Sequence, residues 1–123
     1  MVVNAACIDE DFAWFTRQAA AFDVRVENQS DAWGMIALQG PKALEIAARL
    51  NPKISDQPRF HIAQINLFGA QGYATRTGYT GEDGVEIMLP AEKIATLWNV
   101  LLKLGVTPCG TTLELDANVF AEF

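Results

Sequence analysis

Hydrophobic residues along the chain follow two periods, one typical of strands and one typical of helices. β-branched runs and alternating apolar and polar residues predict strands at residues 1–6, 24–27, 33–38, 60–67, 73–77 and 85–89. Apolar residues at helical spacing predict helices at about residues 10–22, from Pro41 to Leu50, and from Pro90 to a stop at Gly105. Residues 51–59 and 78–84 are predicted loops, and Gly69–Gly72 a hairpin turn.

The order of these elements predicts the fold class. Strands outnumber helices, and most of the strands follow one another along the chain through short turns. This order is typical of an α+β fold, in which helices pack on one face of a mostly antiparallel sheet. A ferredoxin-like, split βαβ arrangement is the most economical way to pack them, and the length suits one domain.

Composition and charge exclude several classes of protein. Of the 123 residues, 50% are hydrophobic and 20% are charged, which suits a folded globular domain. The formal net charge of −6 disfavours binding to nucleic-acid phosphates or to anionic lipid. No apolar run approaches the ~20 residues that a membrane-spanning helix needs. We therefore expect neither nucleic acid nor membrane as a partner.

Cysteine and histidine usage argues against metal chemistry. Cys7 and Cys109 lie far apart, which disfavours a disulfide scaffold and a cysteine-based metal site. His61 is the only histidine, so a histidine cluster is excluded and no metal site is predicted. Unpaired thiols, and an N-terminus without a secretion signal, favour a cytoplasmic location.

The segment from Arg76 to Glu86 is the best candidate for chemistry. Gly78, Gly81 and Gly84 recur every three residues between two predicted strands, and glycine lets the backbone approach a ligand closely. Tyr79 offers an aromatic face, and the carboxylate of Glu86 could accept two hydrogen bonds from an aminopyrimidine edge. By spacing alone the functional interpretation is weak, because a glycine-rich segment with acidic residues is usually a solvated turn. The segment also does not match the phosphate-binding glycine fingerprints.

Residues 76–90, RTGYTGEDGVEIMLP, strongly resemble the signature of the aminomethyltransferase (T-protein) of the glycine cleavage system. Further stretches that resemble this family occur in the family's order: 2–5 with 11–14, 35–41, and 106–110. The resemblance implies a central folate-binding domain over residues 1–110, followed by a divergent tail over 111–123.

The resemblance also implies a reaction and a set of ligand contacts. The parent enzyme takes an aminomethyl group from a lipoyl carrier protein (H-protein), releases ammonia and passes the one-carbon unit to tetrahydrofolate. By this resemblance Tyr79 lines the folate pocket, Glu86 holds the pterin ring, and Asn4 with Val3 lies beside the same pocket.

The departures from the family pattern limit what we expect of this chain. Family members are much longer, their catalytic aspartate lies before the segment matched by Val2, and a C-terminal barrel domain follows. Their folate-binding arginine has no counterpart after Gly110, and Glu114 stands where a second arginine is found. We therefore assign no catalytic residue and expect a fragment that binds folate weakly or undetectably. A non-catalytic folate-binding or interaction module, and a related folate-dependent demethylase, remain alternatives.

Overall fold

The computed structural model describes residues 1–109 and divides into two compact units, Met1–Asp31 and the part that begins at Ala32. The predicted tail over 111–123, with Glu114, lies outside the described residues.

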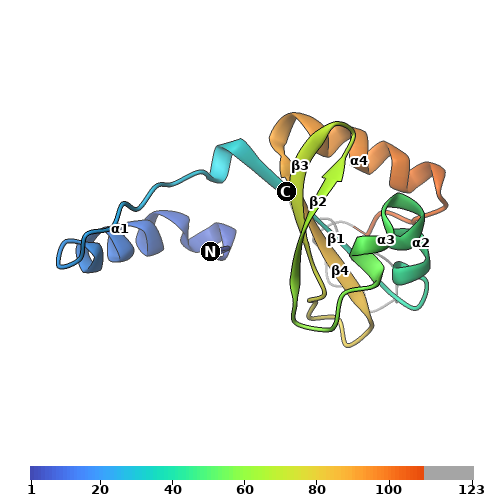
Figure 1. Cartoon of the computed structure of the whole chain (residues 1–123), viewed down its shortest axis with the longest axis horizontal. Coiled ribbons are helices and arrows are strands. Elements are labelled where there is room, and N and C mark those ends of the chain that lie inside the picture. The colour runs from blue at the N-terminus through green and yellow to red at the C-terminus, as the bar shows by residue number, and fades with distance from the viewer. Residues whose placement is uncertain (110–123) are drawn as a thin grey trace. The chain divides into compact units, whose positions relative to one another are not determined.

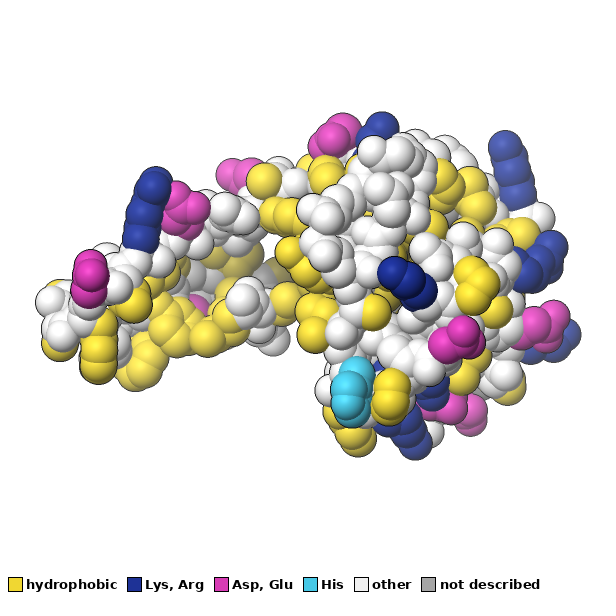
Figure 2. Space-filling model, in the orientation of Figure 1, with side chains coloured by type: hydrophobic (Ala, Val, Ile, Leu, Met, Phe, Trp, Pro, Cys, Tyr) yellow, Lys and Arg dark blue, Asp and Glu magenta, His cyan; other side chains and the backbone are white. Residues whose placement is uncertain are grey.

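The first unit is built around one helix. A 3-10 turn, η1 (Ala5–Cys7), leads into α1 (Ile8–Ala19), and a second 3-10 turn, η2 (Ser30–Ala32), ends the segment. No residue of α1 is buried, and Figure 2 shows hydrophobic side chains gathered along one side of this unit. In this unit Trp14 is 50% exposed and Phe22 is 71% exposed. The unit therefore has no core of its own.

Two strands predicted in this unit are wrong. Residues 1–6 do not form a strand, because the Asn4 side chain accepts a hydrogen bond from the Ala6 backbone N–H at 3.0 Å and caps η1. Residues 24–27 alternate correctly but pair with no strand among residues 1–109. Alternation alone does not make a strand without a hydrogen-bonding partner. The predicted helix is confirmed as α1.

The second unit is a four-stranded antiparallel sheet with helices on one face (Figure 1). Its strands are β1 (Trp33–Gln39), β2 (Ile62–Leu67), β3 (Ala70–Thr75) and β4 (Gly84–Pro90), in the order β1-β4-β3-β2. The helices are α2 (Ala43–Leu50), α3 (Pro52–Ser55) and α4 (Ala91–Lys103). The predicted α+β class is confirmed. The ferredoxin-like arrangement is not specifically confirmed, because β2, β3 and β4 form a meander to which β1 is added.

The core lies between the sheet and these helices. In β4, Val85, Ile87 and Leu89 alternate with outward residues and are fully buried. Leu97 of α4 and Ile54 of α3 belong to the same buried cluster. Alternate residues of every strand point to the opposite side of the sheet. We call that side, which carries Glu86, the Glu86 face.

Short-range signals fix the ends of several elements. The hairpin between β2 and β3 turns at Phe68 and Gly69, both with positive φ, as a two-residue turn of the favoured hand requires. β3 therefore starts at Ala70, earlier than predicted. The predicted helix stop at Gly105 (φ +88°) is confirmed, and Val106 donates its N–H to the Leu101 carbonyl at 3.1 Å in a Schellman motif.

The prediction of a loop throughout residues 51–59 is wrong for α3. The Asn51 side chain accepts from the Lys53 N–H at 3.0 Å, and Pro52 occupies the first helical position. These two residues are ordinary helix-start signals. Among residues 1–109, no helix is both long and apolar enough to cross a membrane.

Candidate functional site

Glu86 lies in the middle of β4, between Ala37 of β1 and Thr75 of β3. Its side chain is half-buried on the Glu86 face. One carboxylate oxygen, Oε2, accepts hydrogen bonds from the hydroxyls of Thr75, at 3.3 Å, and Thr77. The second oxygen, Oε1, accepts no hydrogen bond from any described residue. The two threonines thus orient the carboxylate and leave one of its oxygens able to accept hydrogen bonds from a ligand.

Apolar and aromatic side chains lie on the same face of the sheet as this carboxylate. Met35 and Met88 are paired across β1 and β4, and both are half-buried. The rings of Trp33 and Tyr73 lie 5.8 Å apart, centroid to centroid. A fixed carboxylate beside an apolar strip can recognise a flat heterocycle, since the strip covers its face and the carboxylate binds its N–H edge.

The glycine loop, residues 76–83, connects β3 to β4 and carries Tyr79, which is 63% exposed. A small hollow on this loop is lined by residues 59–60, 76–78 and 82–84. Neither Tyr79 nor Glu86 lines that hollow. A concavity shared by these two side chains therefore stays a prediction.

Arg76 fastens the start of the glycine loop. Its guanidinium donates to the backbone carbonyls of Ser55 at 3.1 Å and Gln57 at 3.0 Å, and to Asp83 at 3.2 Å. The Arg76 side chain is only 10% exposed, whereas Arg59, 3.5 Å from the same aspartate, is 62% exposed. The arginine thereby ties both ends of the loop to the last residue of α3 and to the segment that follows it.

Gln39, the last residue of β1, was missed by the sequence analysis. It is 4% exposed, and its side-chain amide donates to the carbonyls of Thr77 at 3.2 Å and Val85 at 3.3 Å. A Cβ atom at either Gly78 or Gly84 would collide with this amide. The sequence does show Gly78 and Gly84 at the two ends of a loop. It does not show that the side chain packed against both glycines is that of Gln39.

The family model of the GCVT N-terminal domain matches residues 1–114. The chain belongs to this family. Among curated relatives it is 43% identical to an aminomethyltransferase of Synechococcus sp. (strain CC9311) over 124 residues, which cover 95% of this chain and 34% of the relative. It is 47% identical to an aminomethyltransferase of Exiguobacterium sibiricum, with coverage of 95% and 34%. The chain thus spans about a third of the length of these relatives, and the resemblance noted in the sequence is confirmed.

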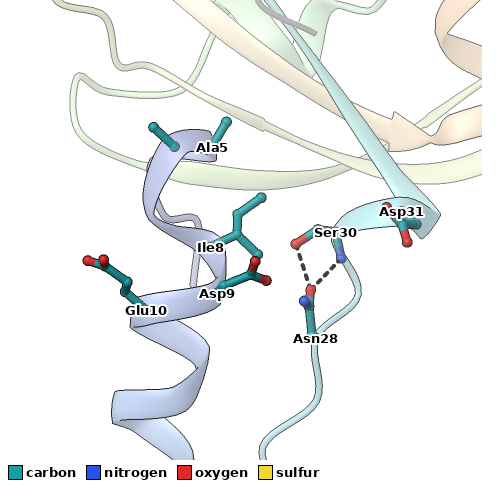
Figure 3. A pocket seen from close by; sticks show the side chains of 8 residues that line it. Ala5, Ile8, Asp9, Glu10, Asn28, Ser30 and Asp31 are labelled. Carbon is teal, nitrogen blue, oxygen red and sulfur yellow. Dashed lines mark hydrogen bonds between the residues drawn. The ribbon is translucent and has the colours of Figure 1, made fainter.

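The first unit of this GCVT N-terminal domain chain carries an open pocket (Figure 3). At its rim the Asn28 side-chain oxygen accepts from the Ser30 N–H at 3.0 Å and from the Ser30 hydroxyl at 2.6 Å. The lining is acidic and includes Asp9, Glu10 and Asp31. Within residues 1–109, no three acidic, histidine or cysteine side chains are grouped so that they could hold a metal ion. The predicted ligand residues Asn4 and Val3 do not line this pocket.

Three further residues considered in the sequence analysis are His61, Cys7 and Cys109. His61 is exposed, with Nδ1 2.9 Å from the Arg59 carbonyl oxygen. Cys7 and Cys109 are not joined in a disulfide. Burial raises the pKa of the Cys109 thiol above its usual value.

Proposed function

We propose that the chain forms the pterin-recognising part of a folate-dependent aminomethyltransferase of the glycine cleavage system. The complete reaction transfers an aminomethyl group from a lipoyl carrier protein to tetrahydrofolate and releases ammonia. The relatives that carry the name aminomethyltransferase are about three times as long as the matched region. We therefore propose that the catalytic aspartate and the carrier-protein contacts come from other parts of such an enzyme.

The anchored carboxylate of Glu86 is the observation that supports this proposal. Thr75 and Thr77 bind Oε2, which orients the group without using Oε1. The aminopyrimidine edge of a pterin presents N–H donors, and a carboxylate accepts such donors in charge-assisted hydrogen bonds. Met35 and Met88 would contact the face of the ring. We further propose that Tyr79 closes over the ring from the glycine loop.

In the first unit, Asn4 and Val3 are proposed folate contacts on the strength of the family resemblance alone. The Asn4 side-chain oxygen is engaged by the Ala6 N–H, so its amide nitrogen is the group that would donate to a ligand. We also propose a cytoplasmic location, as expected of a one-carbon enzyme with thiols that are not in a disulfide.

Titration of the ¹⁵N-labelled chain with 5-formyltetrahydrofolate, followed by NMR, tests the proposal. Because the chain spans about a third of the length of its relatives, we expect weak binding, with a dissociation constant of about 1 mM. Amide shifts should concentrate on residues 75–88. Glu86→Ala should abolish them, whereas the control Glu45→Ala, which removes an exposed carboxylate on α2, should bind like the unaltered chain.

Two results would contradict the proposal. One is binding that survives Glu86→Ala unchanged, which would place the folate elsewhere. The other is the absence of any shift over residues 75–88 at millimolar ligand, which would favour the interaction module without folate binding.

A further inference from the structure

We propose that Gln39 is a positioning residue: its buried amide holds both ends of the glycine loop and, through Thr77, sets the orientation of Glu86. The part of this inference that concerns ligand binding rests on the proposed function. The part that concerns the loop rests on the contacts of Gln39 alone.

The Gln39 amide joins the two strands that enclose the loop. Nε2 donates to the Thr77 carbonyl, just after β3, and to the Val85 carbonyl, at the start of β4. Both carbonyls lie where the chain leaves or enters the sheet. A single buried NH₂ group therefore closes the base of the loop, and at 4% exposure water has little access to replace it.

The glycines at the base of the loop fit around this amide. Neither Gly78 nor Gly84 has a positive φ, so conformational freedom does not explain them. A Cβ atom at Gly78 would lie 2.7 Å from Gln39 Cδ, and one at Gly84 would lie 2.7 Å from Gln39 Nε2, both far inside contact distance. These two glycines are therefore required for the close approach of the Gln39 side chain.

Stability alone is a poor reason for a glutamine here. Its Oε1 is buried and has no donor among the described residues. A buried acceptor without a partner is unfavourable, and an apolar side chain of the same length would avoid that cost. The hydrogen bonds of Nε2 are what an apolar replacement cannot provide.

Thr77 transmits the constraint to Glu86. The backbone carbonyl of Thr77 accepts from Gln39, and the hydroxyl of the same residue donates to the Glu86 carboxylate. If Gln39 no longer held the Thr77 peptide, the hydroxyl and the carboxylate would lose their fixed relation. Gln39 thus orients the Glu86 carboxylate through Thr77 and does not itself contact the ligand.

Fluorine NMR of the chain labelled with 3-fluorotyrosine provides the test, because the sequence has only two tyrosines. The Tyr79 signal, assigned with Tyr79→Phe, reports on the loop, and the Tyr73 signal reports on the sheet. In Gln39→Met we expect the Tyr79 signal to move toward that of the unfolded chain, with Tyr73 unchanged.

Gln57→Met is the matched control. The Gln57 amide likewise donates to two carbonyls, of Ile54 at 3.2 Å and Ala74 at 3.1 Å, and its Oε1 is also buried without a donor among the described residues. The Gln57 carbonyl that accepts from Arg76 is a backbone group and is retained, so this variant should leave the Tyr79 signal in place. If Gln39→Met does not fold, Gly78→Ala, which displaces the Gln39 amide by steric overlap, should shift the Tyr79 signal instead.

Affinity for 5-formyltetrahydrofolate supplies a second readout. We expect Gln39→Met to weaken it about tenfold and Gln57→Met to leave it unchanged. An unshifted Tyr79 signal in a folded Gln39→Met chain, or equal shifts in the two methionine variants, would overturn the inference. If the unaltered chain does not bind folate, the proposed function fails, while the Tyr79 signal still decides the role of Gln39 in the loop.

Discussion

Asp83 forms ion pairs with both Arg76 and Arg59. Replacing each arginine in turn with methionine distinguishes the stability contributed by buried hydrogen bonds from that contributed by an exposed ion pair. Arg76 is 10% exposed and donates to Asp83 and to two backbone carbonyls. Arg59 is 62% exposed and approaches Asp83 only at 3.5 Å. Both variants remove one positive charge next to Asp83, so the difference between them comes from the buried contacts.

The expected losses of stability differ severalfold. Hydrogen bonds that involve a charged group contribute about 1.5–3 kcal/mol each, but part of this offsets the cost of removing the guanidinium from water. Arg76→Met also leaves the Ser55 and Gln57 carbonyls without that donor. We expect it to lower the free energy of unfolding by about 3 kcal/mol. An exposed ion pair contributes about 0.5 kcal/mol, which is the loss expected for Arg59→Met.

Urea unfolding followed by circular dichroism measures both losses. Raising the salt concentration should remove the effect of Arg59→Met, since exposed charges are screened, and should leave most of the effect of Arg76→Met. Equal losses in the two variants, or a loss below about 1 kcal/mol for Arg76→Met, would refute the view that buried arginine contacts fasten the loop.

Three further predictions concern the second unit. Leu97→Ala, at a fully buried position of α4, should cost about 2–5 kcal/mol in urea unfolding, whereas Leu102→Ala, 39% exposed on the same helix, should cost far less. Gly105→Ala should cost about 1–2 kcal/mol in the same assay, because φ is +88° there; an unchanged midpoint would contradict the Schellman geometry. Because burial raises the pKa of Cys109, its thiolate fraction at pH 8 is reduced, and mass spectrometry should show slower alkylation there than for a free cysteine thiol.

Local signals in the sequence were sufficient to predict most of the helices and strands of the second unit. Alternation in β4 and the glycine after α4 identified these elements because the residues that decide them lie next to one another. The strand order could not be read in the same way, since the pairing of β1 with β4 depends on residues far apart in sequence. Residues 24–27 show the opposite error: the alternation is present, but no strand of the described part of the chain pairs with them.

The candidate site was predicted in part for the same reason. Glu86 and Tyr79 were proposed from a contiguous motif, and their role stays a prediction. The structure places Glu86 on the side of β4 opposite the core, with two threonine partners. Gln39 was missed because a glutamine at the end of a strand ordinarily faces water. Its burial becomes evident only when the glycines of a distant loop are brought against it.

The pairing of β1 with β4 has a consequence for how the chain folds. During synthesis β1 leaves the ribosome long before β4 exists, whereas the hairpin of β2 and β3 can close at once through its two-residue turn. The segment Trp33–Gln39 contains no charged residue. Until β4 is made, this uncharged strand lacks the strand with which it pairs in the structure, and we expect aggregation during folding to begin there.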